Sequence, residues 1–207
     1  MRAYSELYVD DVMSQLGAMY DFAVNTCHQE LSLFHARFLS SGIAERISLG
    51  DPKYAGGMSG IETAMEVARR TGSALESASQ MIDAGSPEYW TGWALAYIQW
   101  YLNRDFSKLQ KGGLDIIALH KRYPALHEAD ISKTVDYAQR ILDDYSRLHN
   151  PLKEARRDAG FTQNRLASES GVSLRAIRAY EQGQLSLASA SAGSLRNMER
   201  VLGCTLL

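Results

Sequence analysis

The sequence has few prolines, few cysteines and no long apolar run, and each shortage excludes a class of protein. Only 4 of the 207 residues are proline, and β-branched runs are rare, which predicts an all-α fold. The two cysteines, Cys27 and Cys204, fit no metal-ligand or redox spacing, and isolated thiols are typical of a reducing cytosol. The longest uncharged stretch, residues 89–103, is too short and too polar to span a bilayer.

The N-terminus also lacks the apolar core of a secretory signal, because "MRAYSELYVDD" turns acidic at once. We therefore expect a cytoplasmic protein. Its formal net charge is only −2, but the charge is unevenly distributed. Residues 151–207 carry 8 basic and 5 acidic side chains, a net charge of +3, which leaves −5 on the remainder. This asymmetry indicates that the C-terminal segment faces an anion.

Apolar residues recur at helical spacing through the first 150 residues. Local signals mark several helix starts: Ser59 and Glu62 form a capping-box pattern, Ser86 precedes Pro87, and Asn150 precedes a further proline. The chain predicts helices over residues 4–25, 31–41, 60–70, from 87, and 131–148. It also predicts a helix that ends at residues 50–52 and a short helix between residues 113 and 123. The connection between the last of these and the helix that starts at Pro151 is only about three residues long, with no flexible linker.

The stretch "FTQNRLASESGVSLRAIRAYEQG", residues 161–183, predicts two short helices joined by a tight turn. Thr162 can cap the first helix, and Ser173 can cap the second. Gly171 supplies the left-handed residue that a sharp turn needs. The second helix carries Ile177 and Tyr180 on one face, which predicts that this face is buried.

The opposite face of the second helix carries the side chains that could read DNA. At about 100° per residue, Arg175 lies opposite the apolar face, flanked by Leu174, Arg178 and Ala179, and Gln182 aligns with it two turns later. Arginine binds the acceptor edge of guanine with two hydrogen bonds, or binds a phosphate. Leu174 and Ala179 can contact a thymine methyl or allow close approach. This pattern predicts a helix that enters the major groove.

The segment "LKEARRDAGFTQNRLASESGVSLRAIRAYEQG" resembles the phage-repressor-type (Xre-family) helix-turn-helix domain. The resemblance extends from about Pro151 to the end, and the matching positions are Gly160, Thr162-Gln163, Leu166-Ala167, Gly171-Val172-Ser173, Ile177 and Glu181. It implies that Gln163 and Ser173 contact phosphates and that residues 174, 175 and 179 face bases. It also implies a structural ion pair between Arg156 and Glu181.

One departure from that family concerns the end of the domain. The family fold usually closes with a fifth helix after the segment that resembles "LRNMERVLGCTLL", but here the sequence stops at Leu207. The last helix is therefore expected to be missing or a stub, with part of the domain core either exposed or covered by the N-terminal domain. Two alternatives stay open for residues 151–207, namely a helical bundle without a ligand and a degenerate domain that binds protein.

Three N-terminal blocks, "SGIAERISLGDPKYAGGMSG", "EYWTGWALAYIQWY" and "HEADISK", are similar to blocks in uncharacterised bacterial regulators that join a helical domain to this kind of DNA-binding domain. Some of those regulators accompany toxins. The similarity implies an antitoxin-like regulator with a toxin protein as partner.

Other N-terminal features have two interpretations each. The aromatic helix with Trp90, Trp93, Tyr97 and Trp100 predicts either a partner groove or a core, and core is favoured. "GDPKYAGGMSG" could cradle a phosphate but reads better as an interhelical turn. His120, His127, Glu128 and Asp130 are close in sequence but lack a recognised metal-ligand spacing, so surface or capping roles are favoured. The apolar stripe over 131–145 is either an intrachain core or a dimer seam, and the intrachain core is favoured because the stripe is short for an independent coiled coil.

These patterns predict an all-α protein of two domains. Residues 1–149 form a helical domain for partner binding or oligomerisation, and residues 150–207 form a DNA-binding domain. We expect a homodimeric transcriptional regulator that binds double-stranded DNA, represses its own synthesis, and has no enzyme activity, cofactor or metal. Dimerisation is expected because one recognition helix with few base contacts binds weakly, and paired half-sites multiply the affinity. The alternative is a protein-interaction module or an enzyme whose activity resides in the N-terminal domain.

Overall fold

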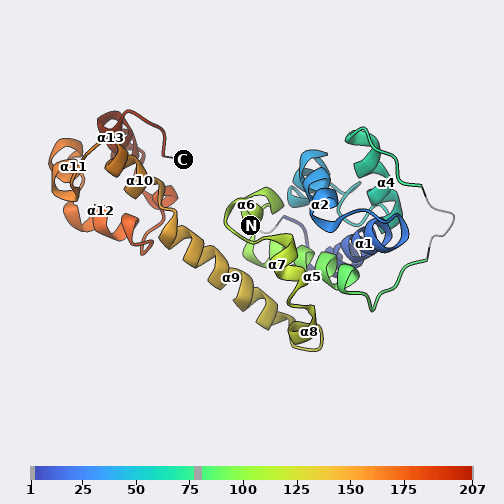
Figure 1. The fold of residues 1–207 in the computed structure, drawn as a ribbon. Coiled ribbons are helices and arrows are strands. Elements are labelled where there is room, and N and C mark those ends of the chain that lie inside the picture. The colour runs from blue at the N-terminus through green and yellow to red at the C-terminus, as the bar shows by residue number, and fades with distance from the viewer. Residues whose placement is uncertain (1–2, 77–80, 207) are drawn as a thin grey trace. The chain divides into compact units, whose positions relative to one another are not determined.

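The computed structural model describes residues 3–76 and 81–206, and the regular elements in these ranges are all helices (Figure 1). The all-α prediction is therefore confirmed. The chain divides into two compact units, and the boundary between Leu142 and Asp143 falls inside helix α9 (Ile131–Leu148). The boundary expected from the sequence, between residues 149 and 150, lies just after the end of that helix. None of the helices within the described ranges combines the length and the apolar character that a bilayer crossing requires.

The first unit consists of short and medium helices around α1. Its elements are η1 (Glu6–Tyr8), α1 (Val9–Asp21), the π-helical turn η2 (Phe22–Thr26), α2 (Leu31–Ser40), α3 (Ile43–Ser48), α4 (Gly60–Arg70), α5 (Pro87–Leu102), α6 (Phe106–Lys111), α7 (Ile116–His120), α8 (Tyr123–Leu126) and the larger part of α9. The sequence predicted α4 and α9 with these bounds. It missed α6 and α8, which are too short to display a helical period. The single helix expected over residues 4–25 is divided into η1, α1 and η2.

The second unit contains the last turns of α9 and five further elements. These are α10 (Pro151–Asp158), α11 (Gln163–Ser170), α12 (Leu174–Glu181), the 3₁₀ turn η3 (Leu187–Ser189) and α13 (Ala192–Leu202). Its core consists of Leu152, Leu166, Val172, Ile177, Tyr180, Leu187, Met198 and Leu206. The described residues contain no helix after α13. Instead, the tail places Leu206 in the core, where its backbone N–H donates to Glu199 Oε1 at 2.9 Å.

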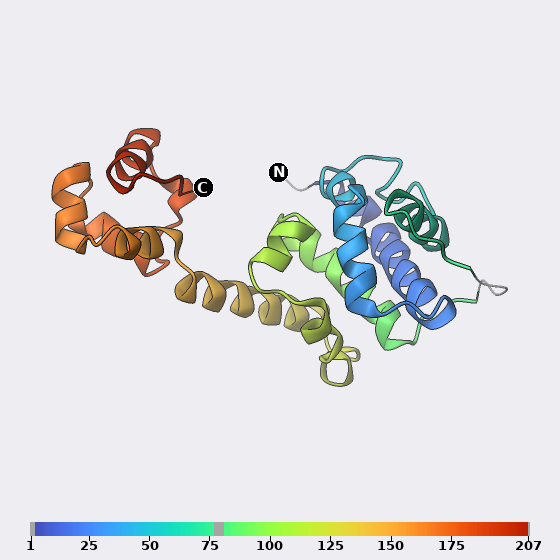
Figure 2. The same ribbon diagram turned by 45° about the horizontal axis from the view of Figure 1, so that its top comes forward.

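Helix α1 packs against both α4 and α5, as the two ribbon views show (Figures 1 and 2). The contact with α5 is close because Gly92 lacks a side chain: a Cβ there would lie 2.3 Å from the carbonyl oxygen of Leu16. At Gly60, on α4, a Cβ would lie 2.5 Å from the Cβ of Ala18. Glycine at these two positions lets the three helices share one core.

Hydrogen bonds at the helix starts agree with the local sequence signals. Ser59 accepts from the backbone N–H of Glu62 at 3.2 Å, and the Glu62 carboxylate accepts from the Ser59 N–H at 2.8 Å. Ser86 caps α5, with Pro87 in the first turn. The loop that leads into α5 is further held by Asp21, whose buried carboxylate accepts from the N–H of Asp83 and from the Ser86 hydroxyl. The predicted starts of these helices are confirmed.

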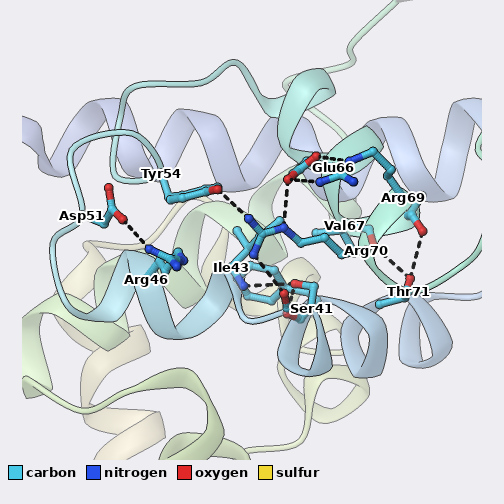
Figure 3. Close-up of polar contacts among 12 residues, drawn as sticks. Ser41, Ile43, Arg46, Asp51, Tyr54, Glu66, Val67, Arg69, Arg70 and Thr71 are labelled. Atoms are coloured by element: carbon cyan, nitrogen blue, oxygen red, sulfur yellow. Dashed lines mark hydrogen bonds and ion pairs between the residues drawn. The ribbon is translucent and has the colours of Figure 1, made fainter.

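The glycine-rich loop between α3 and α4 is held by Arg70 (Figure 3). The guanidinium donates to the Tyr54 hydroxyl at 2.6 Å, to the Ser41 carbonyl at 3.2 Å and to Glu66 at 2.8 Å. Hydrogen bonds from Arg69 and Arg70 lower the pKa of Glu66 to about 2. Tyr54 is buried under these contacts. The loop is thus an interhelical connection fixed by groups of the protein itself, as the sequence favoured.

Trp90 and Trp100 of α5 face the core, which agrees with the favoured core interpretation and corrects the partner-binding assignment of these two residues. Trp90 and Trp100 are 7% and 3% exposed, and the Trp100 indole donates to the carbonyl of Tyr4 at 3.0 Å. Buried rings cannot meet a partner, so these two tryptophans stabilise the core. Trp93 and Tyr97 are half-buried and pack against the same core. A role for these two in partner binding stays a prediction.

His120 and His127, which the sequence raised as possible metal ligands, make separate contacts. His120 Nε2 lies 2.9 Å from Glu88 Oε1, and His127 stacks on the ring of Tyr123. Nowhere in the described part of the chain do three His, Cys, Asp or Glu side chains gather as metal ligands.

A buried histidine makes the first unit sensitive to acid. His35 is 5% exposed, its Nδ1 is hydrogen-bonded to the Tyr20 hydroxyl, and burial lowers its pKa to about 4. An unfolded histidine titrates near 6.5, so the unfolded state binds more protons between about pH 6.5 and pH 4. This part of the stability is fully present above pH 6.5 and is lost as the pH falls through that interval.

We expect His35→Gln to flatten the dependence of the free energy of unfolding on pH between 6.5 and 4.5. Urea titrations at several pH values measure this slope, with His127→Gln as the control because its ring lies near the surface. An unchanged slope in His35→Gln would contradict the assignment.

Candidate nucleic-acid interface

Helices α11 and α12 are set by local caps and one left-handed glycine. The Thr162 hydroxyl accepts from the N–H of Arg165 at 3.1 Å, and the Ser173 hydroxyl accepts from that of Ala176 at 3.2 Å. Between the helices, Gly171 has a φ of +69°, a conformation that side chains with a Cβ disfavour. The two short helices therefore begin where the sequence predicted, and α11 ends at the predicted glycine.

The inner face of α12 anchors it to the second unit. Ile177 is fully buried, and Tyr180 and Glu181 are 8% and 5% exposed. Arg175, Arg178 and Gln182 are exposed on the other side of the helix, where Leu174 and Ala179 are half-buried. Within residues 3–76 and 81–206, neither Arg175 nor Arg178 pairs with a carboxylate, so both guanidinium groups are available to an external anion or base edge.

A hollow of about 830 Å³ extends over this outer face. Its lining consists of Ser173, Leu174, Arg175, Ala176, Arg178, Ala179, Gln182, Gln184 and Leu185. The sequence interpretation did not include Gln184 and Leu185, which follow the helix. Their backbone N–H groups both donate to the carbonyl of Ala179, at 2.9 and 3.2 Å, after a left-handed turn at Gly183. Gly183, which follows the C-cap residue of α12, was the available signal for this returning segment.

A buried ion pair joins α10 to the end of α12. Arg156 donates through Nε and Nη2 to the two carboxylate oxygens of Glu181, and through Nη1 to the carbonyl of Phe161. The two paired side chains are only 12% and 3% exposed. Burial raises the pKa of Glu181, but hydrogen bonds from Arg156 and Gln163 outweigh it and hold the pKa below its usual value.

Gln163 and Ser173, which the family resemblance assigned to phosphate contacts, both have partners in the protein. The Gln163 amide donates to Glu181 Oε2 at 2.8 Å, and Ser173 caps α12. Asn150 has two structural roles, of which the sequence predicted only the helix cap. Its Oδ1 accepts from the N–H of Lys153, and its Nδ2 donates to the carbonyl of Tyr180 at 2.7 Å. Asn150 thus caps α10 and also connects it to the end of α12.

Residues 152–207 match the family model described as helix-turn-helix. The match confirms the phage-repressor-type resemblance for the C-terminal region, which is about a quarter of the chain, and supports a DNA-binding regulator of the Xre type. No curated protein and no solved structure matches the chain significantly.

Because Glu181 is buried, we expect its replacement to lower the free energy of unfolding strongly. Glu181→Gln leaves the Arg156 charge without its partner in a mostly buried site, where such a loss costs roughly 3–5 kcal/mol. Glu169→Gln is the matched control, because it removes an exposed pair with Arg165, and such pairs contribute at most about 1 kcal/mol. Urea titration followed through the amide resonances of α12 measures both changes. Equal losses in the two variants would show that burial does not distinguish the pairs.

Proposed function

We propose that the protein is a sequence-specific DNA-binding transcription regulator that reads the major groove with the outer face of α12. The observation that carries this proposal is the pair of exposed guanidinium groups of Arg175 and Arg178 on a helix whose other face is buried. Guanidinium groups in this arrangement can bind guanine edges directly. Leu174, Ala179 and Gln182 complete the base-reading face in this proposal.

Phosphate contacts position the helix in the same proposal. Gln163 begins α11 and Ser173 caps α12, so both lie at helix N-termini, where backbone N–H groups favour an anion. The Gln163 amide is already oriented by Glu181, which fixes the side chain before DNA arrives. The net charge of +3 on residues 151–207 supports binding to a polyanion, but only modest affinity from one copy.

The test is binding of the whole protein to the DNA upstream of its own gene across a salt series. We expect Arg175→Ala/Arg178→Ala to lower the affinity roughly tenfold or more, because each guanine contact contributes about 1–3 kcal/mol. Arg196→Ala/Arg200→Ala on α13 removes the same charge and should change the affinity much less. Equal losses in the two double variants, or no binding at all, would argue against reading by α12.

We further propose that the protein binds DNA as a homodimer formed through the C-terminal half of α9. Val135, Ala138 and Leu142 of this helix are buried within the first unit, but the apolar stripe continues past them. Tyr145 and Leu148, on the adjoining face, are 38% and 74% exposed. A second copy of the same helix is the occupant that suits this surface, since α9 directly precedes the DNA-binding domain and two such domains read paired half-sites.

We expect Leu148→Asp to convert the dimer to a monomer, because a charge would be buried at the proposed seam. Sedimentation velocity measures the change. Leu49→Asp serves as the control, since Leu49 is equally prominent, at 73% exposed, but follows α3 and is not part of α9. A wild-type monomer at all concentrations would contradict the proposal.

The biological role that we propose is autorepression as the antitoxin of a toxin pair. The acidic balance of residues 1–150 and the similarity of its blocks to antitoxin-like regulators support this role. Co-expression with the protein encoded by the neighbouring gene tests it. If that protein neither co-purifies with this chain nor loses toxicity in its presence, the antitoxin role fails and DNA binding is unaffected.

A further inference from the structure

We propose that the hollow beside Arg175 is a slot for the C5-methyl group of a pyrimidine, formed by Ala176, Ala179 and Leu185. This inference rests on the proposed function and adds to it a chemical preference within the operator. The shared chemistry is the methyl carried by thymine and by 5-methylcytosine. The slot selects a methylated pyrimidine close to the base pair that Arg175 reads.

The first argument is the fixed position of Leu185. Its side chain is 46% exposed although it lines the hollow, and leucine offers nothing to a phosphate or to a polar base edge. The two hydrogen bonds from residues 184 and 185 to the Ala179 carbonyl hold this segment against α12. An exposed leucine held in place on a DNA-facing surface calls for an apolar ligand, and in the major groove the pyrimidine C5-methyl is the apolar group.

The second argument is the spacing along α12. Arg175 and Ala179 are four residues apart and so lie on the same side of the helix, about 5–6 Å from each other. Ala176 lies beside Ala179 on the flank away from Leu174, at about 100° per residue. Successive bases on a strand are about 3.4 Å apart, so the guanidinium and the slot address base pairs one or two steps apart. The guanidinium of Arg175 thus binds guanine, and the slot accepts the methyl group of a neighbouring pyrimidine.

The test begins with duplexes that the full-length protein selects from a random-sequence library, because these define the half-site. Each thymine of the half-site is then replaced by deoxyuridine, which removes the methyl and keeps every hydrogen-bonding group. At one position near the guanine we expect about a fourfold loss of affinity, the value typical of burying one methyl-sized group. At that same position, 5-methylcytosine should bind more tightly than cytosine by a similar factor.

Leu185→Ala should bind thymine and uracil duplexes equally, with the affinity of the wild type for uracil. Leu49→Ala, which truncates an exposed leucine outside the hollow, should keep the fourfold discrimination. No methyl effect in the wild type, or the same effect in Leu185→Ala, overturns the slot. If binding still depends on Arg175 and Arg178, the proposed function stands without it. A protein that selects no sequence overturns both.

Discussion

The arrangement of the helix-turn-helix region depends on one buried ion pair. Arg156 and Glu181 come from opposite ends of the helix-turn-helix region, and the first of them also binds the carbonyl that precedes α11. Glu181 in turn orients Gln163. The pair therefore fixes α10, α11 and α12 relative to one another through three polar contacts. Because both charges are largely removed from water, each is stable only while the other is present. The ion pair holds α12 from its inner side, so the arginines on the outer face of the helix are not needed to hold it in place.

The first unit reaches its packing by a different physical route. Its helices approach closely at Gly92 and Gly60, and the guanidinium of Arg70 is among the groups that hold the loop between α3 and α4. Buried polar groups such as Asp21 and His35 are each paired, so the core tolerates them. A unit built on glycine contacts and paired polar groups has a defined shape.

The sequence predicted those features that depend on neighbouring residues. The caps at Ser59, Ser86, Thr162 and Ser173 are local hydrogen bonds, so the pattern sufficed for them. The inward direction of Trp90 and Trp100 depends on which helices surround α5, and no local pattern contains that information. The bond from Asn150 to the carbonyl of Tyr180 spans two helices, and the approach of Leu185 to Ala179 depends on how the chain turns after α12. These contacts became evident only from the fold.

The placement of the three tryptophans has a spectroscopic consequence. The sequence contains only three, and all of them lie on α5 in the first unit. Intrinsic indole fluorescence excited at the red edge therefore reports on the first unit, and the second unit is silent at that wavelength. A ligand or partner that engages the first unit can be followed optically even while the second unit is bound to nucleic acid.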